Sequence, residues 1–226
     1  MSVEVIIETE NLVKEYKRGR SEIVRAISNI NVKFYEAELI LIRGESGSGK
    51  STMLNMLSGL DNPTEGTINF MGEDITKYSE KELTKLRRNH VGFIFQSWEL
   101  IPNLTALENV EVPLYPEKED AGKIRAKAKE LLRRLDLHDE HFPKFPGQLS
   151  GGQAQRVGIA RALVKNPKVI FADEPTANLD IDNAENIMNL LRRISRQGTT
   201  VIVASHNESL KRYADRVIVL SQGNVV

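Results

Sequence analysis

A buried strand that runs directly into a glycine-rich turn and then into a helix is the feature that most constrains this sequence. Residues Glu38–Arg43 (ELILIR) are apolar enough to form a buried strand, and the turn follows at once. The turn consists of Gly44, Glu45, Ser46, Gly47, Ser48 and Gly49. From Lys50 onward, apolar residues recur with a helical period, at Met53, Leu54, Leu57 and Leu60. The order strand, turn, helix favours an α/β fold.

This turn, continued by Lys50 and Ser51, fits the pattern G-x-x-x-x-G-K-[ST]. Glycines let the backbone wrap closely around a phosphate chain, and the N-terminus of the following helix directs free N–H groups at the anion. Lys50 can reach the terminal phosphates, and the Ser51 hydroxyl can ligate Mg²⁺. The motif predicts a nucleotide site without naming the reaction.

A second apolar run, Lys168–Asp173 (KVIFAD), ends in a carboxylate that Glu174 immediately follows. At the end of a parallel strand, Asp173 would lie beside the phosphate loop and hold Mg²⁺ through water. Glu174 is then the candidate to orient or deprotonate an attacking water, a role that contributes about 10²–10⁴-fold to a rate.

Two more buried strands are predicted at Thr199–Ser205 and Arg216–Leu220, and a helix is predicted at Asp182–Gln197, with Gly198 ending it. Strands that alternate with helices of this length predict a mostly parallel sheet covered on both faces.

Two regions depart from this alternation. Residues 3–36 and 66–72 alternate apolar and polar side chains, as in an antiparallel sheet, whereas residues 97–165 are predicted to be helical. Within the second region, Thr105 and Glu108 have the spacing of a capping box. Further along it, Leu131, Leu132 and Leu135 form one helix face. We therefore expect one domain over residues 1–226, with a helical subdomain nested at about 97–165.

Composition excludes several classes. The 226 residues hold 31 Lys plus Arg and 31 Asp plus Glu, so no basic surplus supports nucleic-acid binding. The absence of cysteine excludes disulfides and thiolate chemistry. Apolar runs are too short to cross a bilayer, and the glutamates near the N-terminus are unlike a signal peptide, so we expect a cytoplasmic protein.

The segment Leu149–Gln153 (LSGGQ) precedes a helical run, and two glycines at a helix start are costly unless the backbone approaches something closely. Ser150 and these glycines would cap a helix N-terminus that can receive an anion. With this segment, the chain resembles the nucleotide-binding subunit of an ATP-binding cassette (ABC) transporter over essentially its full length. Ala154 replaces a residue that is commonly polar in that family.

The resemblance implies that ATP and Mg²⁺ are the cofactors, and it assigns roles to individual residues. ATP contacts fall on Tyr16 (stacking on adenine), Gly44, Glu45, Ser46, Gly47, Ser48, Gly49, Lys50, Ser51, Thr52, Ser150, Gly151, Gly152, Gln153 and Asp180. Metal contacts fall on Ser51, Gln96 and Asp173, and catalytic roles fall on Lys50, Gln96, Glu174 and His206. Here Gln96 would reach the metal and the attacking water, and His206 would contact the γ-phosphate.

The resemblance also implies partners. Two chains would pair head to tail when ATP binds, with the phosphate loop of one facing LSGGQ of the other. Separate transmembrane permease subunits would dock near residues 96–104, placing the chain on the cytoplasmic face of the membrane. From the residues alone, Trp98 and Leu100 are equally compatible with such a docking surface and with packing inside the helical lobe.

Residues 97–114 further resemble the lipoprotein-releasing and macrolide-exporting ATPases and their cell-division relative. A soluble ABC ATPase without transport, of the iron–sulfur assembly or cell-division type, is the alternative. A P-loop kinase would leave LSGGQ and His206 unexplained.

Overall fold

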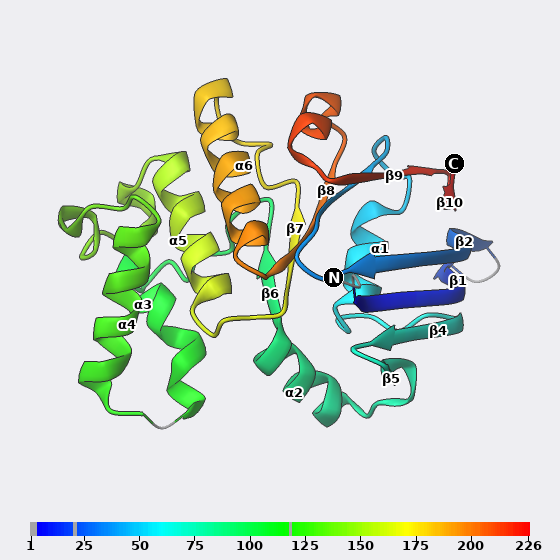
Figure 1. Ribbon diagram of the computed structural model, residues 1–226, viewed down its shortest axis with the longest axis horizontal. Helices are drawn as coiled ribbons and strands as arrows, with labels where there is room; N and C mark the ends of the chain where they lie inside the picture. Colours follow the sequence, from blue (N-terminus) through cyan, green and yellow to red (C-terminus); the bar gives the residue numbers. More distant parts are fainter. Residues whose placement is uncertain (1–3, 20–21, 118) are drawn as a thin grey trace.

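The computed structural model describes residues 4–19, 22–117 and 119–226, and its strands form two sheets (Figure 1). The antiparallel sheet has the order β2-β1-β4-β5, and the larger sheet has the order β10-β9-β3-β8-β7-β6. The first comprises β1 (Val5–Arg18), β2 (Glu22–Tyr35), β4 (Glu65–Phe70) and β5 (Glu73–Asp74). The second comprises β3 (Leu39–Arg43), β6 (Val91–Ile94), β7 (Val169–Asp173), β8 (Thr200–Ser205), β9 (Arg216–Ser221) and β10 (Asn224–Val225).

Helices separate most of these strands. The α-helices are α1 (Lys50–Leu57), α2 (Glu80–His90), α3 (Ala106–Glu111), α4 (Ala121–Arg134), α5 (Gly151–Leu163) and α6 (Ile181–Arg196). Short 3₁₀ helices are η1 (Ile75–Lys77), η2 (Val112–Glu117), η3 (Asp139–His141), η4 (Pro146–Gln148) and η5 (Glu208–Tyr213). In Figure 1, α3 to α6 gather on one side of β6 to β8, and β1, β2 and β4 lie on the other.

The larger sheet lies between two hydrophobic cores. Its strands β9, β3, β8, β7 and β6 are mutually parallel, and only β10 pairs antiparallel. Successive side chains of a strand point to opposite faces. Accordingly, Leu39 and Leu41 pack with the helices α3 to α6, whereas Ile40 and Ile42 pack with α1 and the antiparallel sheet. This arrangement confirms the predicted fold class.

Some element boundaries differ from the predictions. The helix after the phosphate loop was expected to include Leu60, but α1 ends at Leu57 and Leu60 is 49% exposed. Gly59 explains the early end, because its φ of 70° is left-handed and lets Leu60 N donate to Asn55 O at 2.8 Å, closing the helix.

The region 97–165 holds α3, α4 and α5, but its first residues, 97–105, form turns rather than a helix. The capping box predicted at Thr105 is present, with Thr105 Oγ1 accepting from Glu108 N at 3.2 Å. The division into a nested subdomain stays a prediction. Within the described ranges, no helix combines the length and the apolar character needed to span a membrane.

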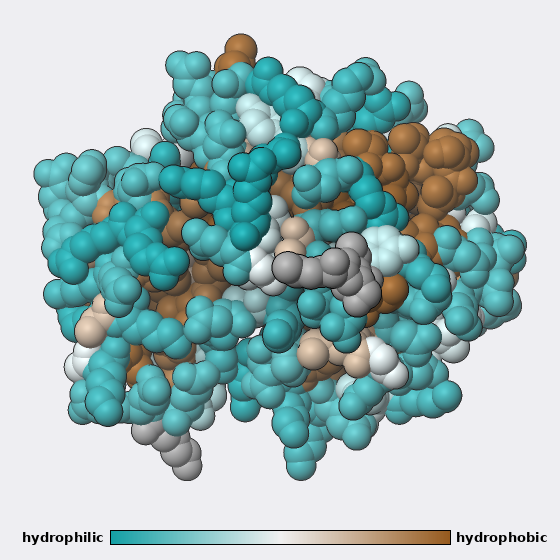
Figure 2. All heavy atoms as spheres, in the orientation of Figure 1, coloured by the Kyte–Doolittle hydropathy of each residue, from teal (hydrophilic) through white to brown (hydrophobic). Residues whose placement is uncertain are grey.

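The face seen in Figure 2 is mostly hydrophilic, with apolar side chains gathered near the β9 and β10 end. Exposed apolar residues of these elements and of β2 include Ile23, Val24, Val217 and Val225.

Candidate nucleotide-binding site

A cleft of about 1270 Å³ lies where the parallel strands β3, β7 and β8 end. All residues from Gly44 to Thr52 line it, so the glycine-rich turn and the start of α1 form one wall. Gln96, Asp173, Glu174 and His206 line it as well. Residues from distant parts of the sequence, such as Gly44 and His206, therefore meet in one cleft, as expected for ligand sites at the carboxyl ends of parallel strands.

Lys50 is the buried cation of this cleft, with 7% of its surface exposed. Its Nζ donates to the carbonyl oxygens of Gly44 at 2.8 Å and Glu45 at 2.9 Å. These bonds hold the ammonium at the loop, where an anionic ligand would compete for it.

Two glycines of the loop are required by packing. A Cβ on Gly44 would lie 2.4 Å from the carbonyl oxygen of Leu220, and one on Gly49 would lie 2.5 Å from that of Ala26. Gly49 also has a φ of 104°, which side-chain-bearing residues rarely adopt. The loop is thus pressed against β2 and β9.

Asp173 ends β7 with an unsatisfied carboxylate oxygen. Its Oδ1 is buried without a hydrogen-bond partner among the described residues. Burial raises the pKa of Asp173, the nearby Glu174 charge raises it further, and a Ser51 hydrogen bond and the Lys50 charge oppose the shift. A buried oxygen with no donor fits a cation, and Ser51, Gln96 and Asp173 offer the oxygen ligands that Mg²⁺ prefers.

The Glu174 carboxylate is held by Ser205, the last residue of β8, and by His206, which follows β8. Its Oε1 accepts from the His206 backbone N–H at 2.9 Å and lies 2.7 Å from His206 Nδ1. Its Oε2 accepts from Ser205 Oγ at 2.7 Å. The backbone of Glu174 has a left-handed φ of 45°, which is uncommon for a residue other than glycine. Glutamate and histidine thus form one hydrogen-bonded unit in the cleft.

Gln96 follows β6 and is tied to the segment that enters α6. Its carbonyl oxygen accepts from Asn178 Nδ2 at 3.0 Å. The next turn has left-handed φ values at Trp98 (62°) and Glu99 (46°), and the Arg161 guanidinium of α5 donates to both carbonyl oxygens. Trp98 is half-buried against Gly151, and Leu100 packs on the helical core.

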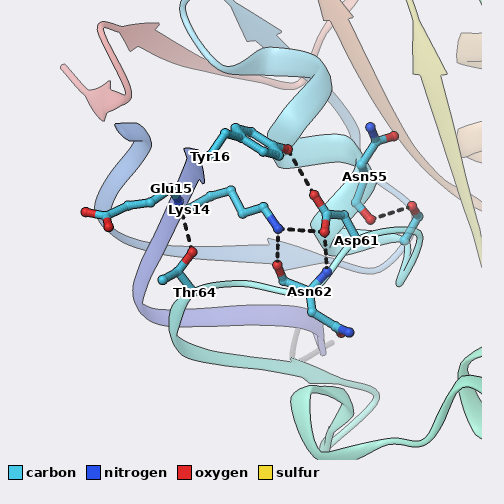
Figure 3. A network of polar contacts seen from close by, with 8 residues as sticks. Lys14, Glu15, Tyr16, Asn55, Asp61, Asn62 and Thr64 are labelled. Atoms are coloured by element: carbon cyan, nitrogen blue, oxygen red, sulfur yellow. Dashed lines mark hydrogen bonds and ion pairs between the residues drawn. The ribbon is translucent and has the colours of Figure 1, made fainter. Parts of the chain in front are cut away.

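Tyr16 on β1 is not among the residues that line the cleft, although Thr52, its neighbour, is. Figure 3 shows Tyr16 and Lys14 converging on Asp61. Tyr16 OH donates to Asp61 Oδ2 at 2.9 Å, and Lys14 Nζ contacts Oδ1 at 2.6 Å. The Lys14 ammonium also lies 5.0 Å from the centre of the tyrosine ring. The ring is therefore fixed at its hydroxyl and covered by a cation.

The LSGGQ segment starts α5 and lies outside the cleft lining of the described chain. Ser150 Oγ accepts from Gln153 N at 3.3 Å, and Gln153 Oε1 accepts from Ser150 N at 2.9 Å. A Cβ on Gly152 would lie 2.7 Å from Asn183 Oδ1. Asn183 is in turn bound by Asp180, the N-cap of α6. A side chain at Gly152 would therefore require the Asn183 side chain to move away from its position beside Asp180.

A model of the family described as ABC transporter matches residues 27–177, which include the phosphate loop, LSGGQ and Asp173. The chain belongs to the ABC transporter family.

Named relatives agree with this assignment. The ABC transporter ATP-binding protein MJ1508 of Methanocaldococcus jannaschii is 45% identical, over 98% of both chains. The macrolide export ATP-binding/permease protein MacB of Pasteurella multocida is 42% identical over 98% of this chain, which spans 34% of MacB. A dimeric post-hydrolysis structure of the M. jannaschii cassette MJ0796, bound to ADP and Pi, superposes with a TM-score of 0.90. It is 44% identical and covers 97% of this chain and 96% of its own.

In this ABC transporter protein, three residues that sequence reasoning missed touch the predicted site residues. His141 Nε2 accepts from Gln153 Nε2 at 2.8 Å, Asp61 binds Tyr16, and Arg161 holds the turn after Gln96. His141, which ends η3, and Asp61, in the bend after α1, carry no spacing signal, because only the folded chain brings each of them to its partner. Arg161 lies in α5, where the helical period of the sequence identifies the apolar face but gives no role to a polar residue.

Proposed function

We propose that the chain is the ATP-binding and ATP-hydrolysing subunit of an ABC transporter. The observation that carries this proposal is the cleft in which Lys50, Asp173 and the Glu174–His206 pair converge on one glycine-rich loop. A lysine, a half-buried carboxylate and a hydrogen-bonded glutamate at the end of parallel strands are parts that phosphoryl transfer to water uses.

Within that cleft, the loop N–H groups and Lys50 would bind the β- and γ-phosphates, which requires Lys50 Nζ to leave the carbonyl oxygens it now contacts. Ser51, Gln96 and Asp173 would hold Mg²⁺. The metal ion would neutralise charge that develops on the phosphate oxygens. Tyr16 would stack on adenine, since Asp61 and Lys14 leave its ring little freedom.

Glu174 would act as the general base toward the attacking water. Both of its oxygens accept hydrogen bonds, Oε1 from His206 and Oε2 from Ser205. Oε1 already accepts from two groups of His206, whereas Oε2 accepts from Ser205 alone and can still accept from a water. Because the His206 side chain is exposed while Glu174 is largely buried, the imidazole ring is the mobile partner. Turning the ring toward the γ-phosphate would leave Oε1 with the His206 backbone N–H as its donor and open its second acceptor position to water.

Two chains would pair head to tail, with Ser150 and the two glycines of one closing the cleft of the other. Three observations support this: Ser150 is exposed, it begins a helix whose N-terminal N–H groups favour an anion, and its own cleft lies elsewhere. The similar cassette MJ0796 is dimeric in its structure with ADP and Pi.

The cycle of pairing and separation would act on separate membrane subunits that contact residues 96–104, with the chain peripheral to the cytoplasmic face of the membrane. Ile101 is 40% exposed there, while Leu100 packs inward, so the segment offers an apolar contact on a supported turn. Similarity to MacB over nearly the whole chain favours the macrolide-export or lipoprotein-release type.

Replacing Glu174 by Gln tests the proposal. We expect ATP hydrolysis to fall about 10²–10⁴-fold, the contribution of a general base, while ATP still binds. The variant with ATP should then elute as a dimer in size-exclusion chromatography with light scattering. Glu130→Gln, an equal change on the exposed surface of α4, should hydrolyse ATP like the unmodified chain. A Glu174→Gln chain that stays monomeric in saturating ATP would contradict the paired mechanism.

Recovery of a tagged chain tests the membrane partner. We expect it to co-purify with membranes through a permease, and exclusive recovery with ribosomes or as free protein would contradict a transport role.

A further inference from the structure

A second cavity, of about 350 Å³, lies between α5 and α6 near the end of α4. Four arginines line it: Arg156 from α5, and Arg192, Arg193 and Arg196 from the last turns of α6. The amides of Asn186 and Asn189 and one carboxylate, Asp136, complete its polar lining. In a chain of zero net charge, four guanidinium groups on one cavity are a local concentration of positive charge.

Neighbouring carboxylates compensate this charge only in part. Arg193 lies 3.7 Å from Asp136, and Arg192 lies 3.8 Å from Asp215, so both pairs are at the outer limit of an ion pair. Arg192 Nη1 also donates to the carbonyl oxygens of Tyr213 at 2.7 Å and Arg212 at 3.3 Å, bonds that leave its positive charge in place. Across residues 4–19, 22–117 and 119–226, no carboxylate lies within 4.0 Å of Arg156 or Arg196. The cavity therefore keeps a net positive lining.

Besides the positive lining, the Arg156 guanidinium lacks a hydrogen-bond acceptor, which is an independent indication of a ligand. Its Nε is buried and has no hydrogen-bond partner in the described chain, and its Nη1 makes only a 3.4 Å contact with Gly152 O. A buried donor without an acceptor is costly, so native structures nearly always satisfy it.

The helix dipole explains part of the cluster but not all of it. Basic residues in the last turn of α6 are favoured by the partial negative charge of the helix end. Arg156 belongs to a different helix, close to the N-terminus of α5, where that effect is reversed. Its presence in the cavity points to an anion shared by the two helices.

We propose that this cavity binds a phosphate-type oxyanion. Planar guanidinium forks match phosphate oxygens in pairs, and the two asparagine amides add neutral donors. The volume suits a small ligand, at the low end of the 300–1,000 Å³ range of ligand pockets. Free phosphate or pyrophosphate and the phosphate group of a small metabolite share this chemistry. The site is separate from the ATP cleft, and none of the residues that line it line the cleft.

The test is calorimetric titration of inorganic pyrophosphate into the full chain carrying Lys50→Ala, which weakens anion binding at the phosphate loop. We expect saturable binding of one ligand per chain. Adding Arg193→Gln and Arg196→Gln should weaken it at least tenfold. Both residues are exposed, so thermal unfolding should show these variants folded. Adding Lys123→Gln and Arg134→Gln, the same charge change on exposed α4, should leave the affinity within twofold.

If both double variants weaken pyrophosphate binding equally, the loss reflects the overall charge of the protein rather than this cavity, and the proposed site is wrong. Absence of saturable binding up to about 10 mM, weaker than the millimolar end of measurable affinities, would overturn it as well. Parallel titrations with phosphate and with AMP distinguish the sources. Tighter binding of AMP than of pyrophosphate would assign the site to a phosphorylated metabolite, and the reverse would assign it to the free anion.

Discussion

Asp173 is half-buried, has a raised pKa caused mainly by this burial, and has one buried oxygen without a partner among the described residues. A carboxyl whose pKa is higher in the folded chain than its ordinary value of 3.8 binds protons more readily when folded. Its contribution to stability is therefore present at low pH and is lost as the pH rises through the folded pKa. At neutral pH and without metal, Asp173 opposes folding.

We therefore predict that Asp173→Asn stabilises the chain in the absence of nucleotide and metal. A gain of about 1 kcal/mol would raise the melting temperature by about 2–4 °C for a protein of this size. Thermal unfolding from pH 7 down to pH 4 should show the gain shrinking as Asp173 becomes protonated. ATP hydrolysis should be lost in the same variant. A variant less stable than the parent at pH 7 would show that Asp173 is satisfied without a ligand.

At the residue level, the sequence foretold which side chains gather in the cleft but not how they are bonded. The ends of β3, β7 and β8 had to meet, because parallel strands end at the same edge. The Glu174–His206 hydrogen bond accompanies a left-handed backbone conformation at Glu174, and nothing in the local sequence predicts that conformation.

Among the helices, a comparison of two serine caps can distinguish a structural role from a functional one. Ser150 and Ser79 both cap a helix through a capping box, Ser150 on α5 and Ser79 on α2. We predict that Ser150→Ala and Ser79→Ala each cost about 1 kcal/mol of stability in denaturant unfolding. Only Ser150→Ala should also lower ATP hydrolysis, since only Ser150 would face a nucleotide. Equal loss of activity in both variants would mean that α5 acts through stability alone.

The turn between β9 and β10 supports the phosphate loop. Gly223 N donates to Ser48 O at 3.1 Å, and its carbonyl accepts from Ser28 N at 2.8 Å. A Cβ on Gly223 would lie 2.8 Å from Ala26 O, whereas one on Gly72, at a similar φ, would meet nothing within 4 Å. The turn therefore links β2 to the loop, and a residue larger than glycine would displace one of them.

We predict that Gly72→Ala costs about 1–2 kcal/mol, the price of a left-handed residue with a side chain. Gly223→Ala should cost more and should also raise the KM for ATP, as measured by unfolding and steady-state kinetics. Equal stabilities with an unchanged KM would show that the β9–β10 turn does not position the loop.

The helices and strands that could be predicted from the sequence are those in which apolar residues recur at regular spacing. Helix α2 was missed because Leu83 is its one fully buried residue, so it shows no apolar stripe, although Ser79 and Glu82 carried a capping signal. Strand β10 is two residues long, too short to alternate. The prediction that the helix after the phosphate loop includes Leu60 is wrong because Gly59, two residues past α1, ends the helix before this apolar position.

For the whole molecule, the question is whether LSGGQ serves its own cleft or that of a partner. A chain with Lys50→Ala has an impaired phosphate loop and an intact LSGGQ, and a chain with Ser150→Arg has the reverse. In a head-to-tail dimer of two identical variant chains, each nucleotide site contains one damaged component. In a mixed dimer, one site combines both damaged components and the other is intact.

Mixing the two variants should therefore restore ATP hydrolysis that neither shows alone. With random pairing of equal amounts, half of the dimers are mixed and about a quarter of all sites are intact, so about a quarter of the parent activity is expected. A chain carrying both changes, mixed with the parent at the same ratio, gives mixed dimers in which both sites are damaged, and hydrolysis should come from parent dimers only. If LSGGQ instead closed the cleft of its own chain, each variant chain would remain damaged, and mixing the single variants would restore no ATP hydrolysis. That result would contradict the head-to-tail pairing.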